Sequence, residues 1–144
     1  PSSPGPATLD LGAPQPTPEF DWFLIHEADQ DTLAYGVADS DEVKLQLYCR
    51  AGSGALELAA MLEKPSNELH LESGGDTERY RAESEAAGIT EGEYARASAK
   101  AMDPVFQRFR RIGWIAVLEG DQRHPYVAHP QSQPRIERFF AACG

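Results

Sequence analysis

The stretch Val43-Lys44-Leu45-Gln46-Leu47-Tyr48-Cys49 alternates apolar and polar side chains, and the turn-forming residues Ala51-Gly52-Ser53-Gly54 follow it. Alternation is typical of a β-strand that buries one face, because successive side chains of a strand point to opposite sides. The pattern predicts a strand over residues 43–49 with Cys49 on its core face. Tyr48 falls on the opposite face, away from the main core.

Runs of similar length lie on both sides of this stretch, with turn residues between them. Their close spacing favours an antiparallel meander over strand–helix–strand units. The predicted fold class is α+β and β-rich: an antiparallel meander curled into a sandwich or partial barrel, with two short helices late in the chain. The predicted strands are 22–27, 32–37, 43–49, 55–62, 68–73, 78–84, 93–99, 114–119 and 122–127, and the predicted helices are 103–112 and 134–143.

The chain has only two cysteines, and both lie on predicted core faces. Cys143 ends a helical apolar stripe that also contains Ile136, Phe139 and Phe140. A disulfide between Cys49 and Cys143 is favoured over buried free thiols, and both are favoured over a catalytic thiol or a metal site, which needs closer ligand spacing. A disulfide implies an oxidising compartment, so we expect a periplasmic or extracellular protein. No apolar run approaches the roughly 20 residues of a membrane span.

Residues 1–19 differ in composition from the rest of the chain, because six of the 11 prolines fall there. Such a segment has little apolar surface to bury, so we predict a disordered, Pro-rich linker followed by one domain over residues 20–144. The linker either tethers the domain to a lipid or to the cell wall, or is a terminus with no role.

Charge is distributed unevenly around a net value of −10. Residues 1–93 carry a net charge of −14 and residues 94–144 a net charge of +4. The acidic majority argues against nucleic acid and against anionic membrane surfaces as partners. The candidate binding residues on the basic part are Arg108, Arg110 and Arg111 on the first predicted helix and Arg135 and Arg138 on the last.

These five guanidinium groups have two interpretations. They form a site for an acidic ligand or for an envelope protein, since the guanidinium fork fits carboxylates. Alternatively, they lie over the helix surfaces and pair with carboxylates of the same domain. Tyr48 is a further candidate, either as an aromatic binding platform or as a side chain packed under a loop.

No established catalytic or metal-binding motif is found in the sequence. Zinc-ligand spacings, phosphate-binding glycine loops and the serine nucleophile elbow are absent, so we predict neither a metal nor a cofactor. His124 and His129 lie near prolines late in the chain, and carboxylates are frequent between residues 57 and 93. They leave open a small envelope hydrolase that uses carboxylates and one of these histidines.

Several features together resemble a group of small exported alphaproteobacterial proteins of mostly unknown function. They are Trp22, the run from Asp39 through Val43 into Leu47-Tyr48-Cys49, the turn Gly52-Ser53-Gly54, and the ending Phe139-Phe140-Ala141-Ala142-Cys143-Gly144. The resemblance covers residues 20–144. It implies export and a disulfide from a strand to the C-terminus, and it transfers no catalytic residue.

The expected function is that of an exported, non-enzymatic binding or accessory protein. The alternatives are the hydrolase and a structural envelope component. A concave cleft with clustered acids and a histidine would favour the enzyme. An aromatic patch beside the arginine helices would favour binding at that surface, and a free sheet edge would favour assembly.

Overall fold

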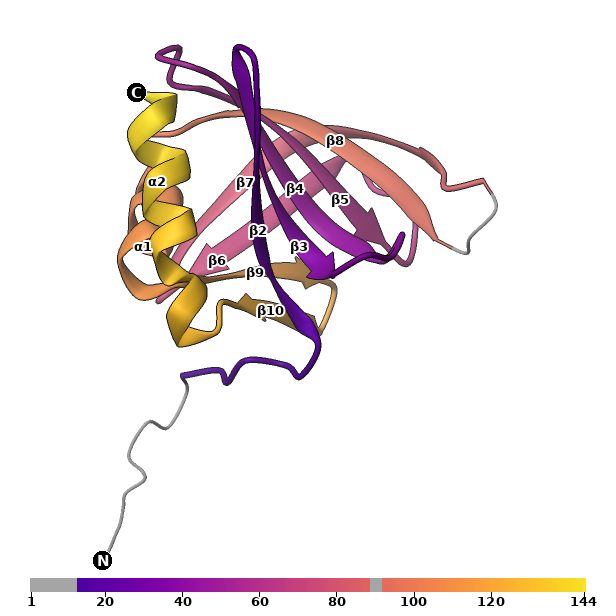
Figure 1. The fold of residues 1–144 in the computed structure, drawn as a ribbon. Coiled ribbons are helices and arrows are strands. Elements are labelled where there is room, and N and C mark those ends of the chain that lie inside the picture. Colours follow the sequence, from indigo (N-terminus) through magenta and orange to yellow (C-terminus); the bar gives the residue numbers. More distant parts are fainter. Residues whose placement is uncertain (1–12, 89–91) are drawn as a thin grey trace, which may run out of the picture.

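The computed structural model describes residues 13–88 and 92–144 of the chain. The predicted fold class is confirmed: nine antiparallel strands form one nearly closed barrel in the order β10-β9-β6-β7-β8-β5-β4-β3-β2 (Figure 1). The strands are β2 (Phe20–Glu27), β3 (Gln30–Val37), β4 (Val43–Arg50), β5 (Ala55–Leu62), β6 (Glu68–Ser73), β7 (Asp76–Ala86), β8 (Glu93–Lys100), β9 (Trp114–Glu119) and β10 (Gln122–Val127). Within the described ranges, no helix is both long and apolar enough to cross a membrane.

Alternation along each strand decides which side chains fill the barrel. Leu45, Leu47 and Cys49 of β4 point inward and are at most 2% exposed. β7 is longer than its neighbours and changes partner along its length: Asp76–Arg81 pair with β6, and Ala82–Ala86 pair with β8. Through this change of partner, β7 joins the β6 side of the sheet to the β8 side, and the sheet curves toward closure.

Two helices fill the open side of the barrel (Figure 1). They are α1 (Pro104–Ile112) and α2 (Gln133–Cys143), and a short 3-10 turn, η1 (Pro130–Ser132), precedes α2. Pro104 suits the first turn of α1, and Gly113, at φ 85°, ends it. The predicted cap Asp103 is at the N-cap position, but its carboxylate does not cap the helix and instead accepts the hydroxyl of Tyr80 at 2.6 Å. The buried faces of the helices meet through Phe106, Phe109, Ile136, Phe139 and Phe140.

The seam between the edge strands β2 and β10 is joined by side chains rather than by a strand ladder. The Trp22 indole N–H donates to the Tyr126 carbonyl at 3.1 Å. Asp21 accepts the backbone N–H of His129 at 3.1 Å and the hydroxyl of Ser132 at 2.5 Å. Arg135 donates to the Trp22 carbonyl at 2.8 Å. These bonds cover polar groups that an open sheet edge would leave free.

The predicted disulfide is confirmed. Cys49 and Cys143 are bonded across 94 positions of the chain, with their Cα atoms 5.6 Å apart. Two backbone bonds support it: Gly52 and Gly54 donate to the carbonyls of Ala142 and Cys143, at 2.9 and 2.8 Å. The C-terminus of α2 is thereby fixed to the turn that joins β4 and β5.

The predicted linker falls largely on residues 1–12, which lie outside the described residues. Residues 13–19 are described and contain no strand or helix before β2. The Thr17 carbonyl lies 3.2 Å from the imidazole of His129 and accepts the N–H of Phe20 at 3.1 Å. This part of the segment therefore contacts the domain that follows it.

Candidate functional site

Three of the five candidate arginines are engaged within the domain. Arg108 pairs with Asp76 at 3.2 Å, and Arg110 pairs with Glu137 through two bonds of 2.6 and 2.7 Å. Arg135 lies over the Phe23 ring at 5.4 Å, besides its bond to the Trp22 carbonyl. Arg111 and Arg138 are exposed, and no ion pair to either is seen in the described part of the chain. The contacts of Arg108 and Arg110 match the interpretation that these arginines pair with carboxylates of the same domain.

The Arg110–Glu137 pair links α1 to α2 and gives a stability prediction. Its hydrogen bonds lower the pKa of Glu137. Arg110→Glu would place two carboxylates together, so we expect a loss of about 1 kcal/mol and a melting temperature lower by roughly 2–5 °C. The swapped variant Arg110→Glu/Glu137→Arg should recover most of this loss, and Arg111→Glu should change little. If all three variants melt like the parent protein, the pair does not stabilise the helices.

Tyr48 lies half-buried on the outer face of β4, where the alternation placed it. Its hydroxyl donates to the Gln46 side chain. Burial and the neighbouring Tyr94 raise the pKa of Tyr48 to about 12, so the phenol stays neutral at physiological pH. Tyr48 lies beside Tyr94, which lines the pocket described next, but Tyr48 itself does not line it.

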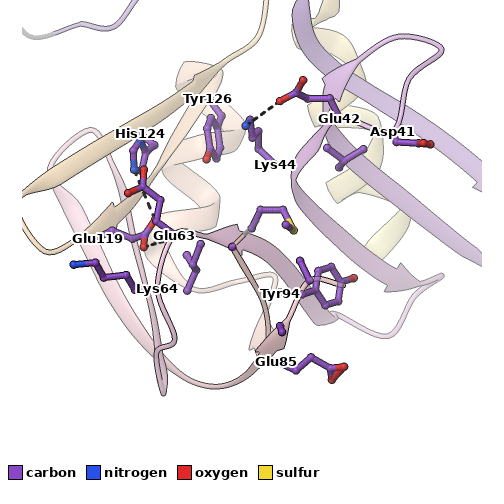
Figure 2. Close-up of a pocket in the computed structure, with 16 residues that line it drawn as sticks. Asp41, Glu42, Lys44, Glu63, Lys64, Glu85, Tyr94, Glu119, His124 and Tyr126 are labelled. Atoms are coloured by element: carbon purple, nitrogen blue, oxygen red, sulfur yellow. Dashed lines mark hydrogen bonds and ion pairs between the residues drawn. The ribbon is translucent and has the colours of Figure 1, made fainter. Parts of the chain in front are cut away.

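A pocket of about 1130 Å³ opens at one end of the barrel (Figure 2). The turns β3–β4, β5–β6, β7–β8 and β9–β10 all fall at this end, because the strands alternate in direction. We call it the mouth pocket. Its lining residues are Asp41, Glu42, Val43, Lys44, Met61, Leu62, Glu63, Lys64, Glu85, Ala86, Ala87, Gly92, Tyr94, Glu119, His124 and Tyr126.

An aromatic stack lies beneath the mouth pocket. Tyr126 comes from the inner face of β10, is 8% exposed, and stacks on Tyr35 at 4.6 Å. Tyr35 in turn contacts Phe20 and Trp22, with ring centroids 5.6 and 5.3 Å away. Among the described residues, the Tyr126 hydroxyl has no hydrogen-bond partner, and Figure 2 shows it directed into the space beside Glu119. Burial raises the pKa of Tyr126, so its hydroxyl keeps its proton and its acceptor lone pairs.

The walls of the mouth pocket are acidic. Five carboxylates line it against two lysines, which leaves a formal excess of three negative charges. Lys44 pairs with Glu42 at 3.1 Å. Glu119 accepts the backbone N–H of Glu63 through both carboxylate oxygens, at 3.0 and 3.2 Å, and lies 3.8 Å from the imidazole of His124. A concave, aromatic-floored site of this charge attracts cations.

The β4–β5 ladder ends beside the mouth pocket. The pairing of β4 with β5 ends at Leu45↔Ala60. Val43 and Lys44 of β4, and Met61 and Leu62 of β5, continue past this point without pairing with each other. All four residues line the mouth pocket. The lining includes side chains from both faces of the sheet, with Leu62 and Tyr126 on the inner face and Met61 and Tyr94 on the outer face.

Sequence reasoning found some of these residues and missed others. His124, a candidate for hydrolysis, does lie in a cleft with acids. The other candidate, His129, lies elsewhere: its imidazole is 3.0 Å from the Phe20 carbonyl and helps hold the segment before β2. Glu119 and Tyr126 were missed, although their inward register was predictable once β9 and β10 were paired as a hairpin. Over residues 13–88 and 92–144, no group of three or more metal-ligating side chains is found.

Family models, curated proteins and solved structures give no match to this chain.

Proposed function

We propose that this chain is an exported, non-enzymatic binding protein that holds a positively charged organic ligand in the mouth pocket. The observation that carries the proposal is the mouth pocket itself: a cavity of about 1130 Å³ with five carboxylates on its walls and the Tyr126 hydroxyl at its floor. Ammonium groups bind favourably to carboxylates, to phenol oxygens and to aromatic faces, and all three are present here.

The Cys49–Cys143 disulfide supports the exported location, because structural disulfides persist in oxidising compartments. The resemblance to exported alphaproteobacterial proteins points the same way and remains a prediction. The arginines of the two helices predict an acidic ligand, whereas the ligand that we propose for the mouth pocket is a cation. The reason is that Arg108 and Arg110 are already paired with Asp76 and Glu137, whereas the mouth pocket has carboxylates in excess.

Matched aromatic ions test this proposal. Benzylamine and benzoate carry opposite charges on similar rings. We expect benzylamine to raise the melting temperature in a saturable way, by about 1.4 kcal/mol of added stability at tenfold excess over its Kd, and benzoate to have no effect. Salt should weaken the binding, since the charges at the rim are accessible to ions.

The matched variants are Glu119→Gln and Glu27→Gln. The first neutralises a wall carboxylate while keeping an acceptor for the Glu63 N–H, and it should weaken benzylamine binding. The second removes the same charge from an exposed position beside the β2–β3 turn, at the end of the barrel opposite the mouth pocket. It should not change benzylamine binding. Equal responses to benzylamine and benzoate would contradict a cation site.

Hydrolysis is a second candidate, because His124 and Glu119 lie side by side in the mouth pocket. One observation favours binding over covalent hydrolysis through a hydroxyl or a thiol. The sixteen lining residues include no serine, threonine or cysteine as a nucleophile. Release of p-nitrophenol from p-nitrophenyl acetate that is fast in the parent protein and lost in His124→Ala would favour the enzyme instead.

An assembly role through sheet edges has less support. The two edge strands, β2 and β10, face each other across the seam, and Arg135 of α2 bonds the backbone of β2. The carbonyls of Trp22 and Tyr126 are therefore already bonded within the domain and do not take part in pairing with a second copy.

A further inference from the structure

We propose that the ligand of the mouth pocket is an aliphatic chain with an ammonium group at each end, which passes through the gap between β4 and β5. One ammonium group binds inside the barrel, at Glu119 and Tyr126, and the other binds outside, at Glu85. This inference rests on the proposed function and adds the shape and charge pattern of the ligand.

The inner end has the groups that an ammonium ion needs. The Glu119 carboxylate gives the counter-charge. The Tyr126 side chain is 8% exposed, and its hydroxyl is an acceptor with no hydrogen-bond partner in the described part of the chain. A carboxylate and a phenol oxygen that face the same part of a cavity can both accept hydrogen bonds from one ammonium group, which strengthens its binding. His124 lies on the same side, 3.8 Å from Glu119.

The outer end is set by the register of three neighbouring strands. Met61 of β5 is opposite Tyr94 of β8, and Tyr94 is opposite Glu85 of β7. Adjacent strands are about 4.8 Å apart, so these side chains form a row that ends roughly 10 Å from Met61. Figure 2 shows Tyr94 and Glu85 together on one side of the mouth pocket, and Glu119 and His124 on the other.

The gap connects the two ends. The β4–β5 ladder stops at Leu45↔Ala60, so the backbones of Lys44 and Met61 are not paired where the row begins, and both residues line the mouth pocket. Methylene groups fit against Met61 and the Tyr94 ring, and an ammonium group beyond them reaches Glu85, which is exposed and has no ion pair among the described residues. A short cation would fill only one end of this site.

The test compares 1,8-diaminooctane with octylamine, which has the same chain and lacks the second ammonium group. We expect Glu85→Gln to weaken diaminooctane binding about three- to fivefold and to leave octylamine unchanged, by calorimetric titration of the full chain. Glu83→Gln is the control, because Glu83 lies two residues away on the same face of β7 and does not line the mouth pocket.

The outcomes separate this inference from the proposed function. If benzylamine fails to bind, the cation site itself is wrong. If benzylamine binds but Glu85→Gln affects diaminooctane and octylamine equally, the outer end is wrong and the inner site stands. If a lysine tripeptide binds more than about tenfold tighter than diaminooctane, the occupant is a basic peptide and the inference is overturned.

Discussion

Replacing Cys49 and Cys143 together by alanine is expected to lower the free energy of unfolding by about 3–5 kcal/mol. The disulfide closes a loop across 94 positions, and a long loop loses much of its freedom in the unfolded chain when it is closed. The bond also fixes the end of α2, whose apolar face completes the core. We expect a fall in melting temperature of roughly 10–20 °C, measured by circular dichroism.

Reduction of the parent protein is the control for this prediction. A reductant should lower the melting temperature of the parent protein toward that of the double variant, and it should not affect the variant. Mass spectrometry of the unreduced protein after alkylation should find no free thiol. Two labelled cysteines, or a double variant that melts like the parent, would contradict the structural role of the bond.

Loss of the Asp21 carboxylate is expected to have the next largest effect. The side chain is 15% exposed and accepts the N–H of Trp22 and His129 and the hydroxyl of Ser132, so it holds β2 to the segment before α2. Asp21→Ala would leave these donors without a partner. We expect a loss of about 2–4 kcal/mol in chemical denaturation, because unsatisfied buried donors cost more than a lost exposed bond.

Two further variants separate the seam from a general effect of charge. Asp21→Asn keeps one acceptor oxygen and should cost less than Asp21→Ala. Asp29→Ala removes an exposed aspartate from the β2–β3 turn and should be nearly neutral. If Asp21→Ala and Asp29→Ala unfold at the same denaturant concentration, the seam does not depend on Asp21.

The strands and helices were predictable because their patterns are local. The alternation of residues 43–49 and the helical stripe ending at Cys143 each decide a face without reference to the rest of the chain. Two cysteines on two buried faces are most simply bonded to each other, and the structure contains this disulfide. The pairing of Arg110 with Glu137 was beyond such reasoning, since it depends on how α1 and α2 cross.

The mouth pocket was beyond the sequence for a related reason. Glu119 is a polar residue at the end of an apolar strand, which also suits an ordinary solvated strand end. Its role appears only when β5, β9 and β10 meet at one end of the barrel. The gap beside Lys44 and Met61 is likewise a property of the sheet, because nothing in either strand alone shows where their pairing ends.

The location of a bound cation tests the account most directly. Backbone amide spectra of the labelled full chain, recorded by nuclear magnetic resonance during titration with benzylamine and then 1,8-diaminooctane, report where each binds. We expect benzylamine to shift the signals of Glu119, His124 and Tyr126, and diaminooctane to shift those of Tyr94 and Glu85 as well. Shifts confined to α1 and α2, or none at saturating benzylamine, would contradict a cation site at the mouth of the barrel.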